Sequence, residues 1–121
     1  MKRVLLVEDH SLFRQVLAVT LKYRTDFREN VQARSLAEAY QVLANSNDRV
    51  DLAIVDLDIP EWGTTDLIQK LHELGVPVLA LTNIQSLEGR TRALQAGANE
   101  VLNMASSNEE LVSVVNRLVS E

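Results

Sequence analysis

Acidic side chains follow two short apolar runs that are typical of buried strands. Glu8 and Asp9 come directly after Val4–Val7, and Asp56 comes directly after Leu52–Val55. Clustered carboxylates repel one another unless a cation or a proton lies between them. Hard oxygen ligands suit Mg²⁺, which binds one or two carboxylates and keeps several waters. A carboxylate beside such an ion can attack phosphorus and form an aspartyl phosphate, so Asp56 is a candidate nucleophile.

Other polar residues lie close to the same run ends. Asp58 follows Asp56 by two positions, and Thr82 ends a later apolar run, where its hydroxyl is suited to donate to a phosphoryl oxygen. A single acid after a strand is usually a cap or a solvated loop residue, and for the Asp58 side chain this alternative has about even odds. Threonine is common in strands, so Thr82 alone is weak evidence. We expect His10 to cap or line the following helix and to have no chemical role.

The elements that would position these residues alternate along the chain. Strand-like runs that are separated by helical patterns indicate parallel βαβ units with right-handed crossovers. We therefore predict an α/β fold of the flavodoxin-like (βα)5 type, a doubly wound parallel sheet with strand order 2-1-3-4-5. In such sheets ligands bind beyond the carboxyl ends of the strands. The expected strands are Val4–Val7, Arg28–Ala33 (at an edge), Leu52–Val55, Val76–Leu81 and Val101–Leu102.

Capping residues and breakers predict where the helices begin and end. Three serines are expected N-caps: Ser11, Ser35 and Ser107. Glu38 lies three residues after the second of them and would complete a capping box. A third helix is expected to open at Thr64 or Thr65, and glycines are expected to end the third and fourth helices: Gly75 and Gly97.

Composition limits the class of protein. We expect residues 1–121 to form a single domain, and the absence of cysteine excludes disulfides and cysteine-based zinc sites. No apolar run reaches membrane-spanning length, and the first residues do not resemble a signal peptide, so a cytoplasmic location is expected. The net charge of −5 argues against nucleic-acid binding by this domain, because phosphate contacts need a basic face.

Four segments resemble the receiver domains of response regulators of the NarL/FixJ-like subfamily. They occur in the family's order and together span most of the chain. The segments are Val4–Arg14, Asp51–Pro60, Val78–Thr82 and Ala93–Leu102. The resemblance implies a phosphoprotein of two-component signal transduction, not an enzyme, with a histidine kinase as its partner.

The resemblance also implies roles for individual residues. Asp56 would accept the phosphoryl group, and Thr82 would be the switch hydroxyl that moves toward it. The side chains of Glu8, Asp9 and Asp56 would hold Mg²⁺. Asp58 would add its backbone carbonyl to the metal site.

Several positions depart from the family's pattern. Met104 stands where the family has a lysine, so the phosphoryl group would lose a charge-assisted contact. Val101 stands where the family has an aromatic switch residue. Gly63 comes one place before the expected glycine position, which Thr64 occupies. Trp62, in the same loop, is expected to be partly buried against the third helix; the alternatives are that it covers the site or forms a contact surface. These departures predict an atypical receiver.

Three functions remain open at this point. The chain is a phosphorylatable receiver with altered output, or a receiver that binds partners independently of phosphate while it keeps Mg²⁺ binding. The departures favour the second as a description of signalling. The third is a haloacid-dehalogenase-like phosphatase, because Asp56-Leu57-Asp58 resembles its Asp-x-Asp motif. That motif usually follows the first strand, however, and the downstream lysine and acidic pair of those enzymes are not found.

Protein partners are expected more than small molecules or membranes. The last helical pattern has an apolar arc of roughly 160° at ~100° per residue. The arc indicates either a helix that is widely buried in the domain, which we favour, or a helix of which part forms a homodimer interface. The members of the arc are Leu111, Val112, Val114, Val115, Leu118 and Val119. The resembled subfamily usually continues into a DNA-binding effector domain. Two alternatives are open: a stand-alone receiver, or an effector domain that lies outside this chain and regulates transcription.

Overall fold

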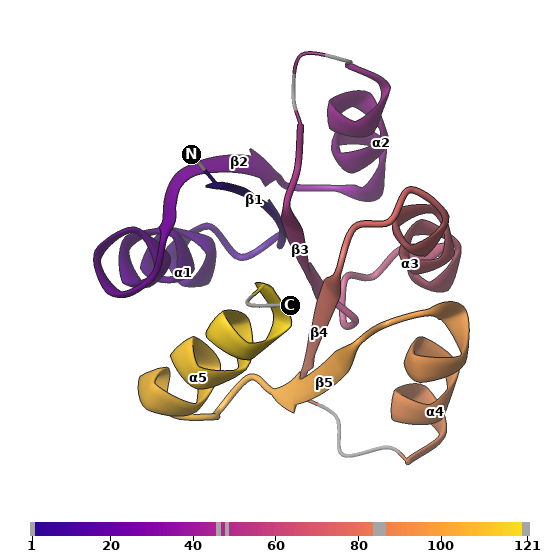
Figure 1. Ribbon diagram of the computed structural model, residues 1–121. Helices are drawn as coiled ribbons and strands as arrows, with labels where there is room; N and C mark the ends of the chain where they lie inside the picture. Colours follow the sequence, from indigo (N-terminus) through magenta and orange to yellow (C-terminus); the bar gives the residue numbers. More distant parts are fainter. Residues whose placement is uncertain (1, 46, 48, 84–86, 120–121) are drawn as a thin grey trace.

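The computed structural model describes residues 2–45, 47, 49–83 and 87–119. Strands and helices alternate strictly along the chain (Figure 1). The elements are β1 (Lys2–Val7), α1 (Ser11–Arg24), β2 (Phe27–Ala33), α2 (Leu36–Ala44), β3 (Leu52–Asp56), α3 (Thr64–Glu73), β4 (Val78–Thr82), α4 (Leu87–Ala96), β5 (Glu100–Asn103) and α5 (Asn108–Val119).

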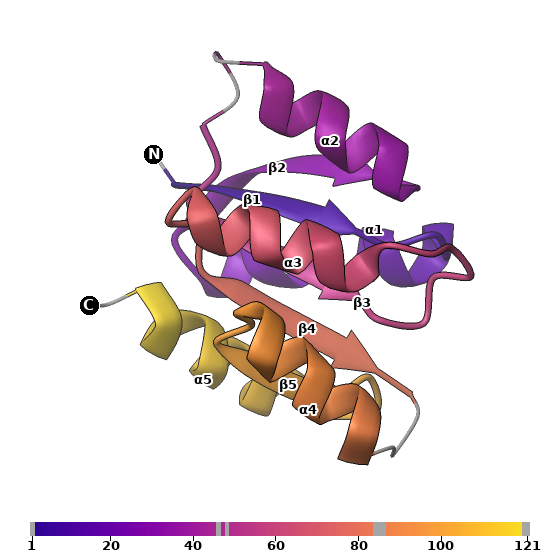
Figure 2. The ribbon, with the colours of Figure 1, turned by 90° about the vertical axis from the view of Figure 1, so that its right-hand side faces the viewer.

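The strands form one parallel sheet in the order β2-β1-β3-β4-β5. Helices α1 and α5 cover one face, and α2, α3 and α4 cover the other (Figures 1 and 2). The predicted flavodoxin-like fold and its strand order are therefore confirmed. The edge position predicted for the second strand is confirmed as well.

Alternate residues of each strand supply two separate cores. In β1, Leu5 and Val7 pack toward α2 and α3, whereas Val4 and Leu6 pack toward α1 and α5. All four are fully buried. A strand that is buried on both faces needs apolar residues at every position, and this explains the unbroken apolar runs of the sequence.

The polar ends of the strands extend further than the apolar runs predicted. Strand β3 includes Asp56 and β4 includes Thr82, because the ladder continues through the pairs Asp56–Leu81 and Thr82–Asn103. At its other end β4 begins at Val78, two residues later than predicted. Pro77 precedes it and has no N–H to donate to the ladder.

Two of the three predicted serine caps are confirmed. Ser35 Oγ accepts from the N–H of Glu38 at 3.2 Å, and Ser107 Oγ accepts from the N–H of Glu110 at 3.1 Å. The capping box differs in detail, because the Glu38 carboxylate accepts from the N–H of Arg34 and not of Ser35. The prediction for Ser11 is wrong: that residue is the first of α1.

The position before α1 is instead occupied by His10. His10 makes no side-chain cap bond, because its ring faces Glu8. Helix α3 begins at Thr64, as one of the two alternatives predicted. Among the described residues, no helix is long and apolar enough to cross a membrane.

Candidate functional site

The carboxyl ends of β1 and β3 bring the predicted acids together. Val7 pairs with Val55, so Glu8 and Asp56 follow at neighbouring positions of the same sheet edge. Ligand atoms from Glu8, Asp9, His10 and Asp56 all lie within 4.8 Å of one another. The sheet register therefore positions all three acids whose side chains were predicted to bind a metal.

Two of these carboxyl groups are removed from water. Glu8 is 1% exposed and Asp56 is 2% exposed. Burial is the largest cause that raises the pKa of Asp56; the N–H of Asp58 opposes the rise and the neighbouring Glu8 adds to it, so that the pKa of Asp56 lies at about 7. In the described part of the chain, Glu8 Oε2 has no hydrogen-bond partner. A buried carboxylate oxygen without a donor is costly, and a cation would relieve this cost.

The donor set fits a hard divalent cation. The carboxylates of Glu8, Asp9 and Asp56 each offer an oxygen within 4.8 Å of the others, and Glu8 also carries the unpartnered Oε2. Asp58 directs its backbone N–H to Asp56 Oδ1 at 2.8 Å, so the loop after β3 is held against the site. Mg²⁺ binds such sites through a few carboxylate oxygens and retains waters.

A buried arginine fixes the end of β1. Arg14 of α1 is 6% exposed, and its guanidinium donates to the Glu8 carbonyl at 2.8 Å and to Gln32 Oε1 at 2.8 Å. It therefore joins α1, β1 and β2 directly beside the acids. The sequence analysis gave Arg14 no role, although an arginine beside apolar helix positions was a usable signal.

Asp58 and Thr82 contact each other. The Thr82 hydroxyl donates to Asp58 Oδ1 at 3.0 Å, and the backbone N–H of Asn83 donates to Asp58 Oδ2 at 2.6 Å. The Asp58 carboxylate thus caps the end of β4. Of the two roles that the sequence left open for this side chain, the structure shows the capping role. This engagement also disfavours the phosphatase reading, in which Asp58 would be a free acid or base.

His10 lies closer to the acids than expected. Its Nδ1 is 3.3 Å from Glu8 Oε1 and 3.5 Å from Asp9 Oδ1, and its backbone N–H donates to Glu8 Oε1 at 3.0 Å. The imidazole therefore helps to orient the Glu8 carboxylate. Nothing in the sequence spacing distinguishes this position from an ordinary cap.

The two replaced positions lie on opposite faces of the sheet. Val101 is buried in the core beneath α3 and α4. Met104 is half-buried and packs against the core beneath α1 and α5, where it lines a small hollow of about 50 Å³ with Phe13 and Leu17. The structure therefore gives Met104 an apolar packing role at the end of β5.

The loop between β3 and α3 places its tryptophan in solvent. Trp62 is fully exposed, so the expectation of partial burial against the third helix is wrong. Ile59, 4% exposed, anchors the loop instead, and Gly63 turns the chain into α3 with a φ of 106°. Trp62 lines a cavity of about 380 Å³ together with Asp58, Thr82, Arg90 and their neighbours.

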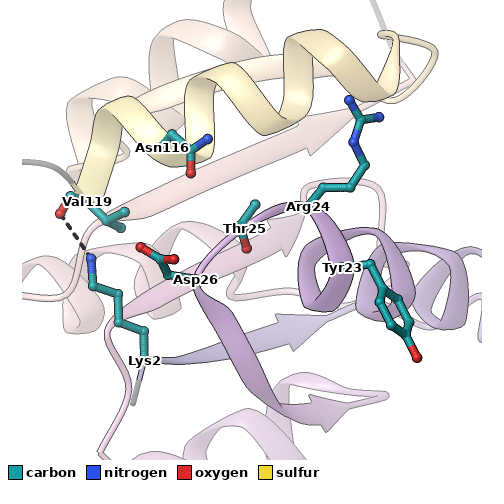
Figure 3. A pocket seen from close by; sticks show the side chains of 7 residues that line it. All are labelled: Lys2, Tyr23, Arg24, Thr25, Asp26, Asn116 and Val119. Atoms are coloured by element: carbon teal, nitrogen blue, oxygen red, sulfur yellow. Dashed lines mark hydrogen bonds between the residues drawn. The ribbon is translucent and has the colours of Figure 1, made fainter.

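Another hollow, of about 470 Å³, lies at the opposite end of the sheet (Figure 3). It is lined by residues that include Lys2, Arg24 and Asp26, and Lys2 Nζ donates to the carbonyl of Val119 at 3.5 Å. Ligands of open parallel sheets bind at the other end of the strands, beyond their carboxyl ends. This rule favours the acids around Asp56, and not this hollow, as the candidate site.

The fold and the site define the class of the protein. Residues 4–116 match the response regulator receiver domain family. The match covers most of the chain, which therefore belongs to this family. Receiver domains are the signal-input domains of two-component response regulators.

The relatives agree with this assignment. The chain is 27% identical over 119 residues to the cell cycle response regulator CtrA of Brucella ovis, an alignment that covers 97% of this chain and 50% of CtrA. The chain thus spans about half the length of the curated relatives it matches.

Solved structures show the same fold. A response regulator of Burkholderia pseudomallei superposes with a TM-score of 0.82 and 26% identity, covering 99% of this chain and 68% of that one. That structure is described as carrying a phosphorylated aspartic acid, a calcium ion and citrate. A LuxR-family DNA-binding response regulator of Staphylococcus aureus gives 0.86 at 18% identity, covering 99% of this chain and 100% of that one.

Proposed function

We propose that Asp56 is the phosphoacceptor of this receiver and that Mg²⁺ binds beside it. The observation that carries the proposal is the buried pair of Asp56 and Glu8, whose Oε2 lacks a partner within the described residues. A related receiver with a phosphorylated aspartic acid and a bound calcium ion supports the same chemistry. The partner that supplies the phosphoryl group is a histidine kinase.

The proposed transfer needs few protein groups. An Oδ of Asp56 forms a bond to phosphorus while the N–P bond of a phosphohistidine breaks, and the imidazole nitrogen keeps the electron pair and takes up a proton. Glu8, Asp9, Asp56 and the Asp58 carbonyl would hold the metal, which neutralises charge on the phosphoryl oxygens. Burial of Asp56 keeps water from the carboxylate and strengthens each electrostatic contact.

The same proposal makes the receiver atypical in its output. Met104 provides no ammonium for the phosphoryl group, and Val101 cannot report phosphorylation through an aromatic rotamer. A phosphate-independent binding module is the second candidate. The observation that favours it is the Asp58 carboxylate, which already engages Thr82 and Asn83 without a phosphoryl group.

Phosphotransfer from a small donor tests the acceptor. We expect intact-mass measurement to find one phosphoryl group on the wild type after incubation with acetyl phosphate and Mg²⁺, and none on Asp56→Asn. Glu73→Gln, an exposed acid on α3, is the control and should label like the wild type. Unlabelled wild type, or labelled Asp56→Asn, would contradict the proposal. Turnover of small phosphate esters would instead revive the phosphatase alternative.

We also propose a homodimer that forms through α1. The apolar residues of α5 are all buried or half-buried, so that helix offers little exposed apolar surface. Helix α1 instead exposes apolar side chains at spacings of four, three and four residues: Leu12, Val16, Val19 and Tyr23. Such a stripe suits a second helix.

The charges at the two ends of α1 support a second copy as the partner. Asp9 precedes the helix, and Lys22 and Arg24 lie in its last turn. An antiparallel pair of α1 helices would place the basic end of each copy beside the acidic end of the other.

The remaining proposals concern the whole protein. We place the chain in the NarL/FixJ-like subfamily, in the cytoplasm, with a DNA-binding effector domain outside the present chain that regulates transcription. LuxR-family neighbours support the subfamily, and the partial coverage of CtrA supports a further domain. A net charge of −5 leaves DNA contact to that further domain.

A further inference from the structure

The Asp58 carboxylate accepts from two hydrogen-bond donors at the end of β4. The Thr82 hydroxyl reaches Oδ1 at 3.0 Å and the Asn83 N–H reaches Oδ2 at 2.6 Å. Each carboxylate oxygen thus accepts from a different, consecutive residue. These short, charge-assisted contacts hold the donors in one orientation.

The same two donors lie beside the proposed phosphoacceptor. Asp56 pairs with Leu81 in the sheet, and the ladder continues from the N–H of Leu57 to the Leu81 carbonyl at 2.8 Å. Thr82 is the last residue of β4, one place beyond Leu81, and Asn83 directly follows the strand. Asp58 is tied to Asp56 by the 2.8 Å bond from its N–H to Oδ1. An anion on Asp56 would therefore meet the donors that the Asp58 carboxylate now holds.

Ordinary capping alone does not require this arrangement. Thr82 and Asp58 line an open cavity of about 380 Å³, and Asn83 is exposed, so water can reach the end of β4. Donors that water can satisfy do not need a carboxylate. A second negative charge this close to Asp56 would also repel an incoming anion.

We propose that the Asp58 carboxylate competes with an anion on Asp56 for the Thr82 hydroxyl and the Asn83 N–H, and so holds the end of β4 without phosphate. The inference rests on the proposed acceptor role of Asp56 and adds a positioning residue to it. Asp58 acts in two opposite ways. Its backbone N–H donates to Asp56 and its carbonyl would bind the metal, whereas its side chain competes with the anion.

A double-mutant cycle separates competition from simple repulsion. The probe is beryllofluoride in the presence of Mg²⁺, and its affinity is measured by calorimetry for the wild type, Asp58→Ala, Thr82→Val and the double variant. We expect Asp58→Ala to tighten binding about tenfold to hundredfold, the range of a charge-assisted contact. Thr82→Val should change little in the wild type and should weaken binding about tenfold in the Asp58→Ala background.

Two further variants control for charge and for the remaining acceptor. Glu61→Ala removes an exposed acid that lines the same cavity, and it should tighten binding less than threefold. Asp58→Asn keeps one side-chain oxygen, so its affinity should fall between those of the wild type and Asp58→Ala. The amide proton resonance of Asn83 reports the contact directly in each folded variant, and it should move upfield when the carboxylate is removed.

The outcomes distinguish this inference from the function on which it rests. An equal cost of Thr82→Val in both backgrounds, or equal gains from Glu61→Ala and Asp58→Ala, would overturn the competition alone. Beryllofluoride that binds none of the variants would contradict the acceptor role of Asp56 and the competition with it. An Asn83 amide resonance that is indifferent to Asp58→Ala would show that the contact itself is absent.

Discussion

Asp56 Oδ1 accepts a hydrogen bond of 2.8 Å from the backbone N–H of Asp58, and this bond is the main stabilising contact for the charged form of a buried carboxylate. Burial outweighs it, and the pKa of Asp56 rises to about 7. The neighbouring charged groups act in the same direction, since Glu8 and Asp58 both raise this pKa. The site is therefore electrostatically costly at neutral pH without a cation.

The first prediction concerns stability as a function of pH. A folded pKa above the ordinary value of 3.8 means that the folded state binds more protons than the unfolded state between about pH 4 and pH 7. Stability in EDTA should fall as the pH rises through this window, by at most ~4 kcal/mol at 1.36 kcal/mol per pKa unit. Urea unfolding at pH 5 and pH 8 measures the fall, which Asp56→Asn should largely remove. An unchanged pH dependence in that variant would refute the explanation.

The second prediction concerns the residue in the family's lysine position. Met104→Lys adds an ammonium at the end of β5 and should tighten beryllofluoride binding about tenfold or more, because charge-assisted contacts are strong. The loss of apolar packing on the α1–α5 core should cost on the order of 1 kcal/mol. Met104→Gln is the matched control, with the same packing loss and no charge. Equal affinities for both variants would show that position 104 does not reach the anion.

The third prediction concerns the arginine that holds the end of β1. Arg14→Met removes the two 2.8 Å bonds to the Glu8 carbonyl and Gln32, and the buried Glu8 carbonyl loses this donor, whereas Gln32 Oε1 still accepts from Gln15 Nε2 at 3.3 Å. We expect a loss of roughly 2–4 kcal/mol of stability and weaker Mg²⁺ binding. Arg34→Ala, which breaks an exposed ion pair with Glu38, should cost under ~1 kcal/mol. Denaturant titration of both variants checks the contrast, and equal costs would contradict it.

The sequence predicted the fold and the acids more completely than the contacts between them. Unbroken apolar runs specify strands that are buried on both faces, and the rule for open sheets then locates Glu8 and Asp56 at one edge. Side-chain pairing depends on rotamers and loop paths that have no periodic signal. Asp58 therefore looked equally like a ligand or a cap, and the burial of Arg14 was not anticipated. The predicted burial of Trp62 was wrong because Ile59, and not Trp62, is the residue that anchors the loop in the core.

The fourth prediction compares two glycines with positive φ. Gly97 has φ 120° and lies so close to α3 that an added Cβ would come within 2.6 Å of His72 Cβ. Gly75 has φ 76° and no heavy atom within 4 Å of an added Cβ. Gly75→Ala should cost ~1 kcal/mol for the backbone alone, whereas Gly97→Ala should cost clearly more, about 3 kcal/mol. Thermal unfolding of both variants measures the difference; similar costs would mean that His72 moves aside freely.

The last prediction tests the α1 stripe as the interface with a second copy. Val19→Glu places a charge in the middle of the stripe, where burial without a partner is costly. We expect sedimentation velocity to find a dimer for the wild type and a monomer for this variant, with unchanged folding by circular dichroism. Leu94→Glu is the control. Leu94 is an apolar residue about as exposed as Val19, and it lies on α4, which covers the face of the sheet opposite to α1. A wild type that stays monomeric at high concentration, or a Leu94→Glu variant that dissociates equally, would contradict an α1 dimer. Reversal of the helix-end charges through Lys22→Glu and Arg24→Glu should also weaken the wild-type dimer, and more strongly at low salt, since the proposed pairing places these residues beside Asp9 of the second copy.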